Sequence, residues 1–321
     1  MANRTYATTL LLISLLGLGG RFVYDLVGMV RNCGAGGYTE DSYLARCDSE
    51  FFGDYDTRAF LYDLEPAAVE NAKNSTVVFA GNSRIQFTFG NNAVRDYFSR
   101  ASIKYYLFGF GDSREAFLKS VIEKMDVNPQ LLVVQTDSWY FGWLGDLEPF
   151  KASKLQETAP ASMQFKKLKQ LVHRQICSNT LFVDYFGGCP DKNVIFRNRH
   201  SGEWDFRSIY NGRRIYSFEF DYAVDDELLA RQKSYAREFL KVIKVPLNCV
   251  VFTSIPWPNE HVGTGQALAE YLGVRFILPK VAGLRTFDDS HLDADSAERF
   301  SEAFLRELDP IVRECVHDAR S

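Results

Sequence analysis

The 321-residue sequence lacks an excess of basic charge and any long run of lysine or arginine. Its 37 Lys and Arg are outnumbered by 41 Asp and Glu, which gives a formal net charge of -4. Proteins that bind the phosphate backbone of nucleic acids usually carry a basic patch or stripe. The charge pattern therefore argues against nucleic acid as a partner.

The sequence also lacks a Cys-x-x-Cys pair, histidine at zinc-ligand spacing, internal repeats and low-complexity tracts. These absences disfavour a structural zinc site and a repeat architecture, and we expect neither a metal nor an organic cofactor. At 46% hydrophobic and 24% charged residues, the composition excludes a disordered or fibrous chain. It predicts one large globular domain with an insertion, or two smaller domains.

An uncharged, leucine-rich run from Thr5 to Gly20 opens the chain after Arg4. No small-x-small cleavage site follows it, so we expect an uncleaved membrane anchor over residues 1–31 rather than a cleaved signal peptide or a buried core helix. Arg21 would lie at the membrane interface or pair with Asp25 one helical turn later. Basic Arg4 predicts a cytoplasmic N-terminus, which places the rest of the chain on the periplasmic side of the cell membrane.

The six cysteines form an even set, and an extracytoplasmic location permits disulfides. The short spacings favour two pairs, Cys33 with Cys47 and Cys177 with Cys189. Cys249 opens an apolar run, so we expect a buried thiol there unless Cys315 packs beside it.

Strand-like and helix-like segments alternate along much of the chain. Five apolar runs rich in β-branched and aromatic residues predict buried parallel strands at 75–80, 103–108, 131–136, 248–255 and 274–278. Amphipathic segments predict helices at 91–101, 112–125, 226–242, 264–272 and 293–308. The alternation predicts a three-layer α/β/α sandwich with a five-stranded parallel sheet.

Residues 138–224 interrupt this alternation, and we expect an inserted cap there. Residues 161–177 have a basic amphipathic pattern, and Asn211-Gly212 predicts a β-hairpin because a type I′ turn needs positive φ at both central positions. Residues 32–73 form a polar lead-in, so the main domain with its cap would cover 74–321.

The first predicted strand leads into Gly81-Asn82-Ser83-Arg84. Ser83 would therefore lie at the carboxyl edge of a parallel sheet, where open α/β folds bind ligands. Taken alone, a serine at this place is more often a helix cap or a turn residue.

Asp288 precedes His291 by three residues, in the loop between the last predicted strand and helix. At this spacing the carboxylate can hold one imidazole nitrogen while the other faces a serine hydroxyl. Helix capping is the structural alternative, with Asp293 or Asp295 and Glu298 starting the last helix. Both interpretations are compatible.

In combination and in this chain order, the Gly-x-Ser and Asp-x-x-His blocks resemble those of the SGNH/GDSL hydrolase superfamily. The resemblance covers roughly residues 74–137 and 245–309. It implies an SGNH-type sandwich with Ser83 as nucleophile, His291 as base and Asp288 orienting the imidazole. With the anchor, the blocks look most like the extracytoplasmic branch that includes the D-alanyl transfer protein of teichoic acids and the alginate O-acetylation proteins. In that branch the partners are multispanning membrane O-acyltransferases.

The resemblance also implies an oxyanion hole made by the Ser83 amide and a glycine amide, from Gly109 or Gly111. For either glycine a tight turn into the next helix is an equal alternative. The third block normally supplies an asparagine donor, but here Asp137 follows the third strand. An ionised Asp137 would repel an oxyanion, so either this donor is lost or Asp137 serves substrate binding or structure.

Three further side chains are candidates for substrate contact. Arg84 would meet an anionic substrate, or form a salt bridge with a neighbouring acid. Trp204 or Tyr210 would stack on a sugar ring, or fill a small core of the cap. The basic helix around Lys166 would rest on anionic lipid or a partner, or present a solvated face.

These features predict O-acyl transfer, with acetyl as the expected group, to a cell-envelope polysaccharide through a seryl ester. Two alternatives stay open. One is an esterase or deacetylase acting on carbohydrate or lipid. The other is a non-catalytic accessory subunit that binds glycan.

Overall fold

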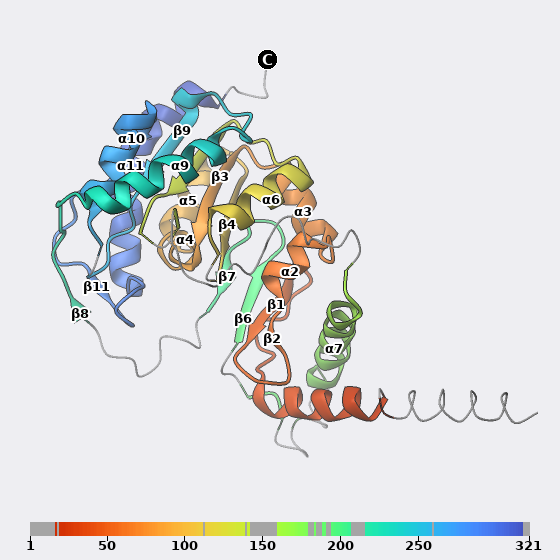
Figure 1. Ribbon diagram of the computed structural model, residues 1–321. Helices are drawn as coiled ribbons and strands as arrows, with labels where there is room; N and C mark the ends of the chain where they lie inside the picture. The colour runs from red at the N-terminus through yellow and green to blue at the C-terminus, as the bar shows by residue number, and fades with distance from the viewer. Residues whose placement is uncertain are drawn as a thin grey trace, which may run out of the picture. The chain divides into compact units, whose positions relative to one another are not determined.

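The computed structural model (Figure 1) describes residues 17, 19–111, 113–138, 140–141, 159–178, 183, 188–190, 194–206, 216–258 and 260–316. These residues fall into two compact units. The first takes its described residues from Met1–Leu64, Thr158–Arg197 and Asp205–Ile209, and the second from Glu65–Glu157, Asn198–Trp204 and Tyr210–Ser321. The segment predicted as one cap, 138–224, thus contributes to both units.

The second unit is built on a five-stranded parallel sheet of order β10-β9-β5-β3-β4. Its strands are β3 (Val77–Asn82), β4 (Tyr105–Phe110), β5 (Leu131–Gln135), β9 (Val250–Thr253) and β10 (Arg275–Phe276). Every residue of β3, β5 and β9 is buried, as continuous apolar runs predict. The mixed α/β class and the parallel five-stranded sheet are confirmed.

The chain leaves β3 toward β4 on one side and returns to β5 on the other. This change of direction makes the carboxyl end of β3 a topological switch point, which is the usual place of a ligand site in open α/β sheets.

Helices of the second unit pack in two groups, one of α4, α5 and α11 and the other of α6, α9 and α10. Their bounds, with those of two further elements, α3 and η3, are α3 (Pro66–Lys73), α4 (Ser83–Phe89), α5 (Asn92–Ala101), α6 (Glu115–Met125), α9 (Asp226–Leu240), η3 (Leu247–Cys249), α10 (Val262–Leu272) and α11 (Ala294–Cys315). Phe79 joins the sheet to the first group, since its ring lies 5.0 Å from that of Phe89, 5.9 Å from Phe98 and 6.3 Å from Phe304.

Helix α11 runs seven residues beyond the predicted end at residue 308 and includes Pro310. The apolar face continues through Ile311 and Val312, both buried, to Cys315. Cys315 forms a disulfide with Cys249, with a Cα–Cα distance of 5.7 Å. The expectation of a free buried thiol at Cys249 is therefore wrong, and the stated alternative that Cys315 packs beside it is correct.

The first unit contains strands β1 (Ser42–Cys47), β2 (Gly53–Asp54) and β6 (Val194–Asn198), in a four-stranded sheet of order β2-β1-β6-β7, where β7 is Trp204–Asp205. Its helices are α2 (Asp56–Leu61), α7 (Ala161–Cys177) and an N-terminal helix whose described residues include 19–32. The predicted disulfides Cys33–Cys47 and Cys177–Cys189 are both present.

The predicted β-hairpin has its turn, Asn211-Gly212, outside the described residues. On either side of this undescribed part, β7 belongs to the sheet of β6, while β8 (Tyr216–Ser217) pairs antiparallel with β11 (Arg285–Thr286). The partners in this pairing are 68 and 70 positions apart along the chain, with Arg285 opposite Ser217 and Thr286 opposite Tyr216.

In the part of the chain that the structure describes, no helix combines the length and apolar content needed to cross a membrane. The predicted anchor falls largely on residues 1–16 and 18, which lie outside this part. Arg21 does pair with Asp25, at 2.9 Å, as one of its two predicted alternatives required.

Candidate active site

Ser83 is the first residue of α4, directly after β3. The cap of this helix is Asn82, whose side-chain oxygen accepts the Arg84 backbone N–H at 2.9 Å. The Ser83 hydroxyl is thus not needed as a cap. It extends instead from the carboxyl edge of the sheet.

Ser83, His291 and Asp288 form a chain of hydrogen bonds. The Ser83 Oγ lies 2.8 Å from His291 Nε2, and His291 Nδ1 lies 2.8 Å from one carboxylate oxygen of Asp288 and 3.1 Å from the other. Ser83 and His291 are 208 positions apart in the sequence. The arrangement is one in which a base accepts a hydroxyl proton while a carboxylate fixes the imidazole tautomer.

A tight turn fixes Asp288 beside the imidazole. Its Oδ1 accepts the backbone N–H groups of His291 at 2.8 Å and Ser290 at 3.2 Å, and Asp289 has φ 61° in the left-handed region. Partial burial raises the pKa of Asp288, but the hydrogen bond and charge of His291 and these backbone donors outweigh it and hold the pKa below its ordinary value. An ionised Asp288 binds Nδ1–H, which leaves Nε2 as the acceptor facing Ser83.

Aromatic rings enclose the imidazole. The ring of Phe87 lies 4.4 Å from that of His291, and Phe287 stacks on it at 5.8 Å. Trp204 is buried and meets Phe87 edge to face at 6.2 Å. Trp204 therefore belongs to the aromatic wall behind the histidine, whereas Tyr210, the other predicted stacking residue, lies outside the described residues.

Arg84 is buried and links Asp137 to the histidine loop. It donates from Nη1 to Asp137 at 2.6 Å, from Nε to the Ser290 carbonyl at 3.1 Å and from Nη2 to the Ser290 hydroxyl at 2.8 Å. Its guanidinium also lies 4.5 Å from the centre of the Trp257 ring. Two roles were predicted for Arg84, contact with an anionic substrate or a salt bridge with a neighbouring acid. The structure shows the salt bridge, with Asp137.

Asp137 is fully buried, and its charge is compensated by Arg84. It also accepts hydrogen bonds from the Gln135 side chain and from the Tyr140 N–H at 2.9 Å. These contacts fix the Asp137 carboxylate at the end of β5, and the positive charge of Arg84 reduces the repulsion of an oxyanion expected from an isolated Asp137.

The two candidate glycines occupy different positions. Gly109 lies within β4 in register with Gly81, and a Cβ there would come within 2.6 Å of the Asn82 carbonyl oxygen. This close approach of the strands explains the need for glycine at position 109. Gly111 follows the last residue of β4, which is in register with Asn82, so it lies beyond the strand end at the level of Ser83.

Sequence reasoning missed one group beside the site. Glu260 is buried and accepts hydrogen bonds from the Ser138 N–H at 3.2 Å, the Ser138 hydroxyl at 3.0 Å and the Trp257 ring N–H at 2.8 Å. Burial, followed by the charge of Asp137, raises the pKa of Glu260 to about 7. No local pattern marks Glu260, since its partner Ser138 lies 122 positions earlier in the chain.

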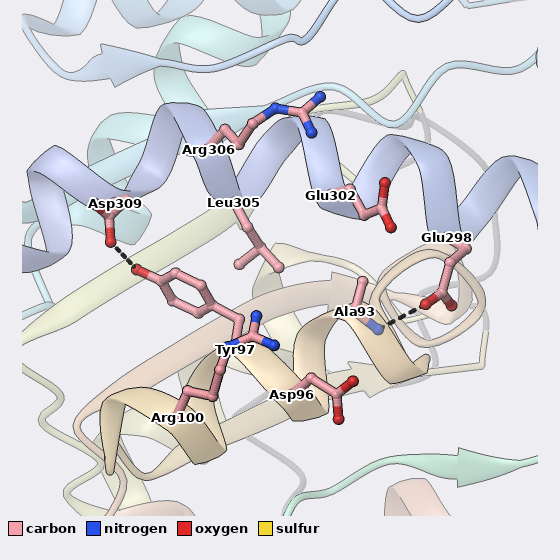
Figure 2. Close-up of a pocket in the computed structure, with 9 residues that line it drawn as sticks. All are labelled: Ala93, Asp96, Tyr97, Arg100, Glu298, Glu302, Leu305, Arg306 and Asp309. Atoms are coloured by element: carbon pink, nitrogen blue, oxygen red, sulfur yellow. Dashed lines mark hydrogen bonds between the residues drawn. The ribbon is translucent and has the colours of Figure 1, made fainter.

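Two features away from Ser83, a histidine–cysteine cluster and a groove between two helices, have the general form of binding sites. His173, Cys177 and Cys189 lie within 4.8 Å of one another, but the two cysteines are joined in a disulfide and are not thiolate ligands. A groove of about 580 Å³ between α5 and α11 includes none of the triad residues (Figure 2). Within it Tyr97 donates to Asp309 at 2.9 Å and Glu298 accepts the Ala93 N–H at 2.9 Å, so the groove side chains join the two helices.

No protein-family model matches this chain, and no curated protein sequence matches it significantly. The assignment of chemistry therefore depends on the geometry of Ser83, His291 and Asp288.

Proposed function

We propose that the protein is an extracytoplasmic SGNH-type serine O-acyltransferase that moves an acyl group, here acetyl, to a cell-envelope polysaccharide. The observation that supports it is the hydrogen-bond chain from Ser83 through His291 to Asp288, with 2.8 Å at each link. This chain is the arrangement that activates a hydroxyl for attack on a carbonyl carbon. An SGNH-type α/β/α sandwich is the fold that accompanies this proposal.

In the first step the Ser83 oxygen attacks the carbonyl carbon of an acyl donor, and His291 Nε2 takes the hydroxyl proton. Asp288 stabilises the imidazolium that forms. His291 then returns the proton to the leaving group as its bond to the acyl carbon breaks, which leaves the acyl group as an ester on Ser83.

The negative charge on the carbonyl oxygen needs hydrogen-bond donors during this attack. We assign them to the Ser83 N–H and the Gly111 N–H, because Gly111 lies past the end of β4 at the level of Ser83. Asp137 occupies the place of a third donor and is bound to Arg84. Loss of one donor costs about 10²–10³ in rate, so slow turnover is expected.

In the second step a sugar hydroxyl gives its proton to His291 and attacks the ester carbon. As the bond to Ser83 Oγ breaks, His291 returns the proton to that oxygen, which restores the free serine and forms the acylated polysaccharide. Water in place of the sugar would make the protein an esterase. The predicted membrane anchor favours transfer, because it would hold the chain beside a multispanning membrane O-acyltransferase as acyl source. The chemistry uses no metal or organic cofactor.

A fluorophosphonate probe tests the nucleophile. The full chain should be labelled, Ser83→Ala should not, and Ser120→Ala should be labelled like the wild type because the Ser120 hydroxyl on α6 donates to the Ala116 carbonyl and takes no part in the triad. Equal labelling of Ser83→Ala and wild type would reject Ser83 as the nucleophile.

A second experiment separates transfer from hydrolysis. The wild type is given p-nitrophenyl acetate with and without purified envelope oligosaccharide, and acetyl-oligosaccharide and acetate are both measured. Transfer predicts that oligosaccharide diverts acetyl groups from acetate to sugar ester. Release of acetate alone would indicate an esterase.

The buried Asp137–Arg84 pair favours one further candidate, an accessory subunit that keeps the fold to bind glycan. It replaces the usual side-chain donor with a carboxylate. Glycan binding by a chain that the probe does not label would favour this function.

A further inference from the structure

Helix α7 buries three polar side chains and exposes three large apolar ones. Lys169, Gln170 and His173 are buried in the first unit, whereas the Phe165, Leu168 and Leu171 side chains are 43%, 47% and 57% exposed. These three apolar residues follow one another at three-residue spacing and form a stripe along one helix face. A surface helix normally has the opposite arrangement.

Specific contacts hold the helix in this orientation. Lys169 Nζ binds Asp25 at 3.1 Å and the Phe51 carbonyl at 2.9 Å. The Gln170 side-chain oxygen accepts the Leu44 N–H at 2.6 Å. Rotating the helix to bury the stripe would break these bonds and leave buried polar groups without partners, which is costly. The stripe is therefore fixed toward the outside.

His173 supports the same orientation, with its Nδ1 3.1 Å from the Tyr38 hydroxyl. The ring of Tyr38 lies 5.8 Å from that of His173 and 5.9 Å from the guanidinium of Arg174. The polar face of α7 is thus the face that packs on the unit.

The stripe adjoins the N-terminal helix, which belongs to the same unit. Phe22 and Phe165 have ring centroids 6.4 Å apart, and Figure 1 shows one end of α7 close to this helix. Val23, Tyr24 and Val27 of this helix are also exposed, by 58%, 59% and 45%. Two helices therefore expose apolar side chains near the point where the leucine-rich run of residues 5–20 joins the folded unit.

We propose that the α7 stripe of Phe165, Leu168 and Leu171 lies in the interface of the lipid bilayer that holds the N-terminal run. Helices with such a stripe and flanking basic residues insert their apolar face about 5–10 Å into the boundary between headgroups and acyl chains. This proposal rests on the predicted membrane anchor and is independent of the chemistry at Ser83.

Charge favours lipid over a second protein as the occupant. Lys166, Lys167 and Arg174 are half-buried on α7 near the stripe, where each lysine ammonium donates one hydrogen bond to a backbone carbonyl and keeps further N–H donors, and Arg21 is exposed on the adjoining helix beside Asp25. Basic residues at the rim of an apolar helix face suit anionic headgroups. Membrane contact along α7 would also limit rotation of the first unit about its anchor.

Site-specific fluorescence in vesicles tests this position. All six cysteines are paired in disulfides, so Leu168→Cys supplies a single thiol for an environment-sensitive dye in the full chain. Asp48→Cys is the matched control, because Asp48 is exposed in the same unit and is charged. Both are reconstituted at a low protein-to-lipid ratio in phosphatidylcholine and phosphatidylglycerol vesicles with nitroxide-labelled acyl chains.

The proposal predicts several-fold stronger quenching by the labelled lipid at position 168 than at position 48, and the opposite order with aqueous iodide. It is overturned if iodide reaches both positions equally, or if the chain does not sediment with vesicles. Protection of position 168 from both quenchers would also overturn it, because that result indicates a protein occupant. The fluorophosphonate result at Ser83 has no bearing on these outcomes.

Discussion

His291 is held from three directions, by Asp288 at Nδ1 and by the rings of Phe87 and Phe287 at its sides. The rings restrict the movement of the imidazole, and the carboxylate selects its tautomer. The position of one side chain thus depends on two aromatic residues that have no chemical part in the proposed reaction.

Asp288→Asn should lower kcat for ester cleavage roughly 10³–10⁴-fold while the fold is kept. An amide can donate to Nδ1, which would put the proton on Nε2 and remove the acceptor for the Ser83 hydroxyl. Asp289→Asn is the control, since asparagine tolerates the left-handed φ at this exposed neighbour. Steady-state kinetics and circular dichroism measure the two effects, and unchanged kcat in Asp288→Asn would contradict the assigned role.

The difference in unfolding free energy between Glu260→Gln and the wild type should shift in favour of the variant when the pH is raised from 5 to 8. The pKa of Glu260 is raised from 4.5 to about 7 in the folded chain. Its contribution to stability is therefore complete below pH 4.5 and is lost as pH rises through about 7. Glutamine cannot ionise, so the difference between the proteins should grow by up to about 3 kcal/mol.

Urea unfolding at the two pH values measures this difference. Glu302→Gln, an exposed change on α11, is the control and should follow the wild type. A Glu260→Gln effect that is equal at pH 5 and pH 8 would argue against ionisation of a buried Glu260.

At the scale of elements, Arg84 joins three parts of the chain that end at the same edge of the sheet. It extends from α4 to Asp137 after β5 and to Ser290 in the loop before α11. Arg84 thus has two roles in the structure: it pairs with Asp137, and it positions the loop that carries His291.

Arg84→Lys should lower kcat about 10–100-fold without raising KM, because lysine keeps a charge near Asp137 but cannot also hold Ser290. Kinetics with p-nitrophenyl acetate and an acidic ester distinguish this role from substrate binding, which would raise KM for the acidic ester. Arg100→Lys, an exposed change on α5, provides the control.

The Cys249–Cys315 disulfide closes a 66-residue separation and joins the start of β9 to the end of α11. Replacing both cysteines by serine should destabilise the protein by about 4 kcal/mol, whereas replacing Cys33 and Cys47, only 14 positions apart, should cost about 3 kcal/mol. Thermal and denaturant unfolding measure both. A smaller loss for the long loop would contradict the loop-entropy argument.

The five parallel strands were predicted within about two or three residues, because buried strands need long apolar runs that are visible locally. Helix α4 was missed. It has only seven residues between Asn82 and Gly90, and a single cap residue, Asn82, starts it. Helix α11 was predicted to end at residue 308, seven residues too early, whereas burial of Ile311 and Val312 continues its apolar face past Pro310.

At the scale of the whole molecule, acid should destabilise the protein partly through His173. Burial lowers the pKa of this fully buried imidazole from 6.5 to about 4. The unfolded chain binds the proton more readily, so stability is complete above pH 6.5 and is lost as pH falls toward 4. The loss from this group should reach about 3 kcal/mol.

His173→Gln should show a weaker fall in unfolding free energy between pH 7 and pH 4.5 than the wild type. His200→Gln, at an exposed position, is the control and should keep the wild-type slope. Equal slopes for all three proteins would exclude His173 as a source of the acid sensitivity.

The two compact units also show the limit of local reasoning. Residues 161–177 were predicted as part of a cap on the main domain, and instead they lie in the unit that contains the lead-in. Lys169 and Gln170 explain this membership through bonds to Asp25 and Leu44. The amphipathic pattern predicted the helix, but its buried polar face depends on those distant partners.

The sequence by itself determined the alternating strands and helices, the two short disulfide pairs and the two motifs that hold the candidate site residues, because each depends on residues close together in the chain. Only the tertiary structure decided that Ser83 meets His291 across 208 positions, that Arg84 neutralises Asp137, and that α7 exposes its apolar face. These contacts depend on how separate elements pack. Side-chain hydrogen bonds reach only about 3 Å, so they form where packing brings the elements together.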